Sequence, residues 1–381
     1  MEWLKKILTA LISLSIALLI GELFLRIAAP LPSANHHQLF CEFDPVLGWK
    51  KMANYSGTHH TEEYEVTERF NSQGLRGPEY PSVRDSQTTR VLVLGDSYVE
   101  AYMVDFPETF TQVCEATLQE RAEASTYQVI NGGTGGYATD QEFLFYQREG
   151  IKYHPEVTVL MVCINDVWFN NQPKYWRGQK PLFAWQSDSL VLTNVPLAAP
   201  DDRSAGVRLK GWALQYLQLA RRLKILKDKI AMANATVKVP EDLRVYQRNF
   251  DPEVAAAWEM TTHLFTAIQQ QAKAINSRLI IGFIPEKEAI YPEAWEAFKN
   301  AYDVTDENYD PLRLQQLLQA YCQERGIPFF DPTAALKREA KARPEHPLYY
   351  EFDSHWNAAG MRIVGMSLAE FIMQEWPAEG K

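Results

Sequence analysis

The sequence predicts an α/β protein, a three-layer α/β/α sandwich built on a five-stranded parallel sheet. Two observations indicate this class. Apolar segments without polar–apolar alternation recur along the chain, as expected for strands that are covered on both faces of a sheet. Segments with helical patterns separate them, which is the order that produces parallel strands joined by crossover helices.

Strands and helices alternate from residue 88 onward. The expected strands cover residues 91–94, 127–130, 157–162, 278–284 and 327–330. The expected helices cover residues 108–124, 140–150, 252–275, 311–324 and 357–375. This alternation predicts a doubly wound sheet, in which a ligand site lies outside the carboxyl ends of the strands.

Residues 1–30 are expected to form a transmembrane anchor or a signal segment. An uncharged apolar run at residues 7–21 approaches the length of a spanning helix, although Glu22 and Arg26 follow it. A poor cleavage site favours an anchor that is retained, with a membrane contacted through residues 7–27. A cleaved signal and a buried core helix are the alternatives.

Lys5 and Lys6 precede the apolar run. Positive residues favour the cytoplasmic side of a membrane, so the remaining chain is expected to be extracytoplasmic, in the periplasm or at the cell surface. Residues 31–87 predict a linker and a small irregular β region, because Gly and Pro punctuate short segments there. Residues 88–381 are expected to form the main domain.

An insertion at residues 167–250 interrupts this main domain, because it is too long for a simple connection. Its first half is rich in aromatic residues. Its second half spaces apolar residues by three and four positions, as on one face of an amphipathic helix: Trp212, Tyr216, Leu219, Leu223, Leu226 and Ile230. We expect this helix to pack on the body of the protein. A lid over the site and a surface resting on anionic lipid are the alternatives.

Composition excludes some classes of function. The 381-residue chain has a net charge of −10, which argues against nucleic-acid binding, since phosphate attraction needs clustered basic residues. Cys41, Cys114, Cys163 and Cys322 form no metal-type pair and are expected to be free buried thiols. The histidine pairs at 36–37 and 59–60 are expected to lie in surface loops. No metal or organic cofactor is predicted.

Chemically useful residues follow three consecutive strands. The first strand ends at Ser97, the second runs into a glycine-rich turn at residues 131–136, and the third runs into Asn165. These groups should converge at one edge of the sheet. A histidine, His355, returns much later with Asp353 beside it. A serine hydroxyl needs such a base to attack a carbonyl, and an acid orients the base.

The same residues could carry the charge that develops in this attack. Backbone N–H groups at Ser97 and in the glycine turn, with the Asn165 amide, would donate to the carbonyl oxygen. Simpler interpretations exist for each residue alone: Ser97 as a helix N-cap, and Asn165 in a turn. A phosphate-binding loop is disfavoured because the turn lacks the expected Lys-Ser/Thr ending.

These blocks together resemble the SGNH/GDSL hydrolase superfamily, named for Ser, Gly, Asn and His in separate blocks. Ser97 in Gly-Asp-Ser matches the first block, with Tyr98 where leucine is usual. The oxyanion glycine of the family falls on Gly136. Asn165 matches the third block, with Cys163 where glycine is usual. The resemblance implies a flavodoxin-like sheet and an oxyanion hole formed by Ser97, Gly136 and Asn165.

The last block departs from the family pattern. The family usually has Asp-x-x-His, whereas this chain has Asp353 only two positions before His355. Asp353 is the expected triad acid, with Glu351 or a Ser–His dyad as alternatives. The Asp-x-His-Trp arrangement is similar to that of polysaccharide O-acetyltransferases in the superfamily. The apolar N-terminus and the segments around Trp49 and at residues 71–76 resemble membrane-tethered bacterial members.

The resemblance implies an enzyme that hydrolyses an O-acyl ester, short-chain or acetyl, through an acyl-serine. The expected substrate is an acylated carbohydrate or lipid, and Tyr98, Trp168 and Trp356 are candidate substrate-binding residues. Two alternatives remain open. An O-acetyltransferase would pass the acyl group to a polysaccharide, and a non-catalytic envelope protein would carry a vestigial site.

Overall fold

The computed structural model describes residues 2–29, 31, 40–81, 85, 87–122, 126–175, 178–200, 205–233 and 238–376. The chain divides into two units. The first unit comprises Met1–Gln38, His60–Glu62 and Asp201–Lys238. The second unit comprises Leu39–His59, Glu63–Pro200 and Val239–Lys381.

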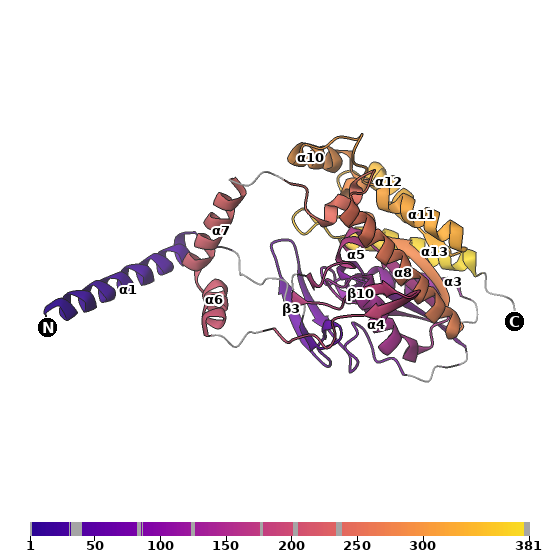
Figure 1. Cartoon of the computed structure of the whole chain (residues 1–381), viewed down its shortest axis with the longest axis horizontal. Helices are drawn as coiled ribbons and strands as arrows, with labels where there is room; N and C mark the ends of the chain where they lie inside the picture. Colours follow the sequence, from indigo (N-terminus) through magenta and orange to yellow (C-terminus); the bar gives the residue numbers. More distant parts are fainter. Residues whose placement is uncertain are drawn as a thin grey trace. The chain divides into compact units, whose positions relative to one another are not determined.

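A five-stranded parallel sheet forms the centre of the second unit (Figure 1). Its strands lie in the order β13-β12-β7-β5-β6, which is the flavodoxin-like order, and this confirms the predicted fold class. The bounds are β5 Thr88–Gly95, β6 Thr126–Gly133, β7 Val157–Val162, β12 Arg278–Phe283 and β13 Phe329–Phe330. The carboxyl ends of β6, β5 and β7 are therefore neighbours, with Gly95 opposite Gly133.

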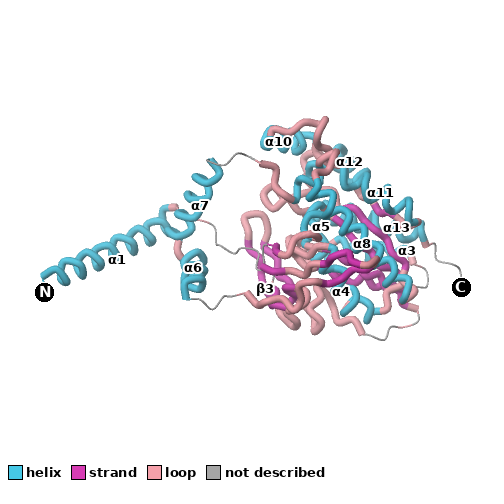
Figure 2. Tube along the Cα trace, viewed as in Figure 1, coloured by secondary structure: helices cyan, strands magenta, loops and turns pink. Residues whose placement is uncertain are grey.

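Helices cover both faces of this sheet (Figure 2). Leu92 and Leu94 pack with α4 (Thr139–Arg148), α8 (Pro252–Ala274) and α11 (Arg313–Arg325). Val91 and Val93 point to the other face and pack with α3 (Phe110–Arg121), α12 (Thr333–Ala342) and α13 (Ala358–Glu375). Successive strand residues thus contribute to two cores, which explains why the strands read as uninterrupted apolar runs.

Shorter helices connect these layers. They are α2 (Ser97–Glu100), α5 (Ile164–Phe169), α9 (Lys287–Ile290), α10 (Pro292–Tyr302), and the 3-10 turns Phe106–Glu108, Gly150–Tyr153 and Asp242–Tyr246. The helices α10 and α12 are not among the predicted elements, although both are amphipathic. None of the four cysteines forms a disulfide, and Cys114, Cys163 and Cys322 are buried, as the sequence predicts. The expected burial of Cys41 is wrong, because this side chain is partly exposed.

Two antiparallel hairpins form the region before the sheet: β1 (Cys41–Asp44) with β2 (Gly48–Lys51), and β3 (Ser56–His60) with β4 (Glu65–Arg69). One expectation for this region is wrong. His59 is buried, and its imidazole lies 2.8 Å from a Glu68 oxygen, because β3 directs this side chain inward. The pair at residues 36–37 lies outside the described residues.

The insertion begins with two more hairpins, β8 (Lys174–Tyr175) with β9 (Gly178–Gln179), and β10 (Phe183–Gln186) with β11 (Ser189–Leu192). Two helices follow, α6 (Ala205–Tyr216) and α7 (Gln218–Ala233). The single amphipathic helix expected here is wrong, because the chain breaks at Leu217. Both helices group with the N-terminal helix in the first unit, and their expected packing on the body stays a prediction.

The N-terminal helix α1 (Glu2–Ala28) is long and apolar enough to cross a membrane by length and composition, and its window of highest hydropathy has no buried residue. A helix of 27 residues is about 40 Å long, against roughly 30 Å for the hydrocarbon core of a bilayer. A signal sequence would have the same character.

Candidate active site

Ser97 stands on a sharp turn between β5 and α2. Gly95 is required at the turn, because a Cβ there would lie 2.2 Å from Val99 Cγ2. Asp96 caps α2 by accepting the backbone N–H of Tyr98 at 2.9 Å. The turn therefore presents the Ser97 hydroxyl, which is partly exposed, at the carboxyl edge of the sheet.

The structure brings together the serine, histidine and acid that the sequence predicts as a catalytic set. Ser97 Oγ lies 2.8 Å from His355 Nε2, although 258 positions separate them along the chain. His355 Nδ1 is hydrogen-bonded to Asp353 Oδ1. The His355 side chain is 18% exposed and that of Asp353 6%, so the acid is shielded while the base still reaches solvent.

Backbone geometry explains how an acid only two residues before the histidine can reach it. Ser354, between them, has a left-handed φ of 68° and tightens the chain. The surrounding loop is closed by hydrogen bonds from Tyr350 N–H to the His355 carbonyl at 2.9 Å and from Asn357 N–H to the Leu348 carbonyl at 3.0 Å.

Two residues that sequence reasoning missed hold the acid in place. The Tyr64 hydroxyl donates to Asp353 Oδ2 at 2.7 Å. The Glu63 carboxylate accepts the backbone N–H of Asp353 at 2.8 Å and that of Glu351 at 2.6 Å. Both residues lie just before β4, in the small N-terminal β region. The Glu351 side chain is exposed, so the structure places Asp353 and not Glu351 at the histidine.

The pKa of His355 is raised above its ordinary value. Burial is the largest influence and lowers it, but the hydrogen bond and charge of Asp353 raise it, as do the charges of Asp96 and Glu286. The net effect is a base that holds its proton more strongly than a free imidazole does.

Aromatic side chains pack against His355. The Tyr98 ring centroid lies 4.5 Å from that of His355 and 4.8 Å from that of Trp356. The Tyr98 hydroxyl donates to Glu286 at 2.7 Å, and burial raises the pKa of this Glu286 carboxyl to about 8.

The three aromatic residues that the sequence suggests for substrate binding are buried. Tyr98 is 4% exposed, Trp356 0% and Trp168 4%, so none presents a face to a ligand in this conformation. The Trp168 ring is instead covered by the Arg244 guanidinium, 5.0 Å from its centroid. We assign all three a packing role, because an indole or phenol in the core positions its neighbours instead of stacking on a substrate.

Donors for a developing oxyanion follow the neighbouring strands. Gly136 has a φ of 76°, and no described residue accepts a hydrogen bond from its backbone N–H. The Asn165 amide donates to Asp96 Oδ2 at 2.8 Å, and the Asn165 side chain is also hydrogen-bonded to Tyr175, so its orientation is fixed. The three groups that the sequence predicts as oxyanion donors, in Ser97, Gly136 and Asn165, thus follow the neighbouring strands β5, β6 and β7.

A buried polar network supports the glycine turn from the N-terminal β region. Trp49 Nε1 donates to the Gly135 carbonyl at 3.0 Å, and the Tyr137 hydroxyl donates to the Trp49 carbonyl at 2.7 Å. Glu100 accepts the Gly135 N–H and pairs with Lys51, whose side chain is 3% exposed. Both the N–H and the carbonyl of Gly135, the residue before Gly136, are therefore hydrogen-bonded, which fixes the turn.

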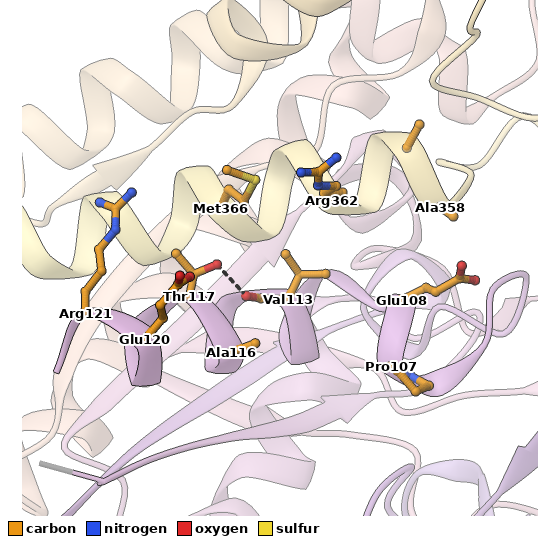
Figure 3. Close-up of a pocket in the computed structure, with 11 residues that line it drawn as sticks. Pro107, Glu108, Val113, Ala116, Thr117, Glu120, Arg121, Ala358, Arg362 and Met366 are labelled. Carbon is orange, nitrogen blue, oxygen red and sulfur yellow. Dashed lines mark hydrogen bonds between the residues drawn. The ribbon is translucent and has the colours of Figure 1, made fainter.

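A groove of about 580 Å³ between α3 and α13 is separate from this site (Figure 3). Val113, Thr117, Arg362 and Met366 are among the residues that line it, and none of the Ser–His–Asp residues does.

A flavodoxin-like sheet with a hydrogen-bonded Ser–His–Asp set at its carboxyl edge defines the class of α/β hydrolytic enzymes. The model of the GDSL-like lipase/acylhydrolase family matches residues 93–363. The chain belongs to this family and is an SGNH-type hydrolase that acts on esters.

Some solved structures match the chain at low identity. An acetyl xylan esterase is 13% identical, with 75% of this chain and 99% of that chain covered and a TM-score of 0.41. A catalytic mutant of an acetylxylan esterase from Geobacillus stearothermophilus is 13% identical, with coverages of 78% and 98% and a TM-score of 0.40. No curated protein matches the chain.

Proposed function

We propose that the enzyme hydrolyses a short-chain or acetyl O-acyl ester of a carbohydrate or lipid through an acyl-serine at Ser97. The observation that carries this proposal is the 2.8 Å contact between Ser97 Oγ and His355 Nε2. An intact hydrogen-bonded set, with its acid supported by Tyr64, also argues against a vestigial site.

In the first half-reaction, Ser97 Oγ attacks the ester carbonyl and its proton passes to His355 Nε2. Asp353 stabilises the imidazolium through Nδ1–H. The carbonyl oxygen becomes an oxyanion and meets the N–H groups of Ser97, Gly136 and Asn165, each contributing about 2.7–4 kcal/mol to the transition state. The tetrahedral intermediate collapses as His355 Nε2 protonates the departing alkoxide, leaving acyl-Ser97 and a free alcohol.

In the second half-reaction, water replaces the alcohol. His355 removes a proton from the water as it attacks the acyl-serine, and then returns this proton to Ser97 Oγ as the C–O bond breaks. The products are a carboxylic acid and the free enzyme. If a sugar hydroxyl took the place of water, the same steps would produce an O-acetylated saccharide.

The proposal includes a location. We place α1 in a membrane as an uncleaved anchor, with Lys5 and Lys6 on the cytoplasmic side and the hydrolase unit on the extracytoplasmic side. The length and apolar character of α1 support this location.

A fluorophosphonate probe tests the nucleophile. We expect the full chain to be labelled at Ser97, with labelling abolished in Ser97→Ala and strongly reduced in His355→Ala. Ester turnover in Ser97→Ala should fall by on the order of 10⁶-fold, as for other serine nucleophiles. Ser189→Ala, at an exposed serine in β11, is the matched control and should label normally. Equal labelling of Ser97→Ala would refute the proposal.

A substrate panel tests the rest. Acetylated xylan oligosaccharides, p-nitrophenyl esters and long-chain lipid esters would be compared with the same preparation, and free acid and acylated saccharide would both be measured by mass spectrometry. Free acetate as the main product supports the hydrolase. An acylated saccharide that accumulates in place of acetate would show a transferase.

A further inference from the structure

We propose that α6 and α7 form an interfacial helix pair that lies on an anionic lipid surface beside the end of α1. The proposal rests on the anchoring of α1 in a membrane that is proposed above. The helix pair belongs to the same unit as α1, and its position therefore follows the end of the spanning helix.

The first step of the argument is the contact between α7 and α1. Glu22, near the end of α1, accepts the backbone N–H groups of Gln218 and Leu219, both at 2.9 Å. These are the first residues of α7, where backbone donors lack partners within the helix and attract a negative charge. Arg26 pairs with the same carboxylate at 2.9 Å.

This contact explains the charge that interrupts the apolar run. A carboxylate at the edge of a bilayer is costly unless its oxygens are hydrogen-bonded. Two of the hydrogen bonds to Glu22 come from the start of α7, and Arg26 supplies a third. Residue Gln218 adds a second link, since its side-chain oxygen accepts the Leu31 N–H at 2.9 Å. The start of α7 is thereby held at the membrane-boundary end of α1.

The second step is the apolar surface of the pair. Large apolar side chains on both helices are well exposed: Leu209 64%, Trp212 51%, Tyr216 53%, Leu223 58% and Leu226 54%. Aromatic rings at the junction of the helices, with Trp212 and Tyr216 centroids 6.1 Å apart, are typical of the boundary between lipid and water. Exposed aromatic and leucine residues in this number need an apolar environment.

The third step is charge. Residues 205–233 carry seven basic residues and one acidic residue, whereas the whole chain has a net charge of −10. Lys210 on α6 and Lys227 on α7 are both exposed. Helices that combine basic residues with exposed Trp and Leu lie in the interface of bilayers with anionic headgroups. Charge and apolar surface therefore point to the same occupant, an anionic lipid surface.

The experiment uses the full chain in lipid nanodiscs made of phosphatidylcholine, with or without phosphatidylglycerol. A bimane label is placed at Leu223→Cys, in a Cys41→Ser background because the other three cysteines are buried. A second label at Lys337→Cys, on exposed α12 of the other unit, is the reference. Doxyl-labelled lipid and aqueous iodide are the two quenchers.

We expect the label at 223 to be quenched severalfold more by doxyl lipid than the label at 337, and severalfold less by iodide. Quenching by doxyl lipid should increase with phosphatidylglycerol. Lys210→Glu with Lys227→Glu should weaken it, whereas the matched pair Lys337→Glu with Lys341→Glu should leave it unchanged.

Equal access of iodide to the two labels, in discs that retain the chain, would overturn the interfacial pair while the anchor stands. Equal quenching with both sets of charge variants would overturn the preference for anionic lipid. Release of the full chain from membranes by alkaline carbonate would instead overturn the anchor itself, and the interfacial pair with it.

Discussion

The left-handed backbone at Ser354 lets Asp353 and His355 meet although one residue separates them. This φ is unfavourable for any residue other than glycine, and it is most unfavourable for β-branched residues. The cost is tolerated because the loop is closed by the Tyr350–His355 hydrogen bond and because Glu63 binds the Asp353 N–H. The shorter spacing in this chain thus has a specific backbone solution.

This explanation predicts opposite effects for two substitutions at one position. Ser354→Gly should keep ester turnover, since glycine adopts the left-handed region without strain. Ser354→Val should reduce kcat by about tenfold or more, because valine disfavours the backbone that joins acid and base. Steady-state kinetics on p-nitrophenyl acetate measures both. Equal activity of the two variants would contradict the role assigned to this backbone.

The raised pKa of His355 predicts a pH profile. The base acts when it is neutral, so kcat/KM should rise with pH and reach half its maximum at the pKa of His355, above the ordinary value of about 6.5. Asp353→Asn removes a negative charge, and the half-maximum should move to lower pH while the plateau falls by about 10⁴-fold. A plateau that falls only slightly would indicate a Ser–His dyad.

Motifs identified Ser97, His355 and Asp353 because each stands in a recognisable block after a predicted strand. Glu63 and Tyr64 could not be found in this way. They precede a short hairpin strand, and no spacing links them to an acid nearly 290 positions later. Burial of Tyr98, Trp168 and Trp356 also depends on packing that motif position does not reveal.

Among the secondary-structure elements, the hairpins of the N-terminal β region support both ends of the site. The β2 strand supplies Trp49 and Lys51 to the glycine turn, and the segment before β4 supplies Tyr64 to the triad acid. Elements that look irregular in the sequence thus position the catalytic groups that the larger sheet carries.

The buried Lys51–Glu100 pair gives a test of this support. Lys51→Met leaves Glu100 without its charged partner and should lower the free energy of unfolding by about 3–5 kcal/mol. It should also lower kcat more than it changes KM, because the oxyanion donors act in the transition state. The exposed neighbour is the control, and Lys50→Met should change little. Urea unfolding and kinetics measure these effects.

The loss should depend on pH. The pKa of Glu100 is raised to about 7 by burial, and loss of Lys51 would raise it further. A folded-state pKa above the unfolded value makes stability fall as pH rises, so the deficit of Lys51→Met should be larger near pH 8 than near pH 5. Lys51→Met with Glu100→Gln removes both charges and should recover much of the stability. A deficit independent of pH would contradict this account.

The central strands β5, β7 and β12 were predictable because they are buried on both faces, which leaves a continuous apolar signal. The break between α6 and α7 at Leu217 was not, because the apolar spacing continues across it from Tyr216 to Leu219. Short hairpins such as β8–β9 lack the length for a periodic signal.

On the scale of the whole molecule, the chain forms two units whose segments interleave along the sequence. The described site residues, from Trp49 to Asn357, all belong to the second unit. The start of α7 is linked to the end of α1 by hydrogen bonds such as that between Glu22 and Gln218, 196 positions apart. Sequence periodicity carries no information on such contacts, so the association of α7 with α1 could not be predicted.

This division predicts that a chain beginning at Leu31 keeps its kcat on a soluble ester while it no longer sediments with membranes. The core of the sheet and the Ser–His–Asp set do not include α1. Turnover of p-nitrophenyl acetate and a sedimentation assay measure the two properties. Loss of turnover in a chain that retains its circular dichroism spectrum would show that α1 contributes to catalysis.

Three buried cysteines that form no disulfide can be used to follow local unfolding. Cys114 lies in α3, Cys163 beneath the loop of Ser97, and Cys322 in α11, and burial raises the pKa of each. Each thiol reacts with an alkylating reagent only when its own region opens. The alkylation rates of the three native cysteines therefore report separately on the opening of α3, α11 and the catalytic edge. Mass spectrometry could measure these rates without any engineered label.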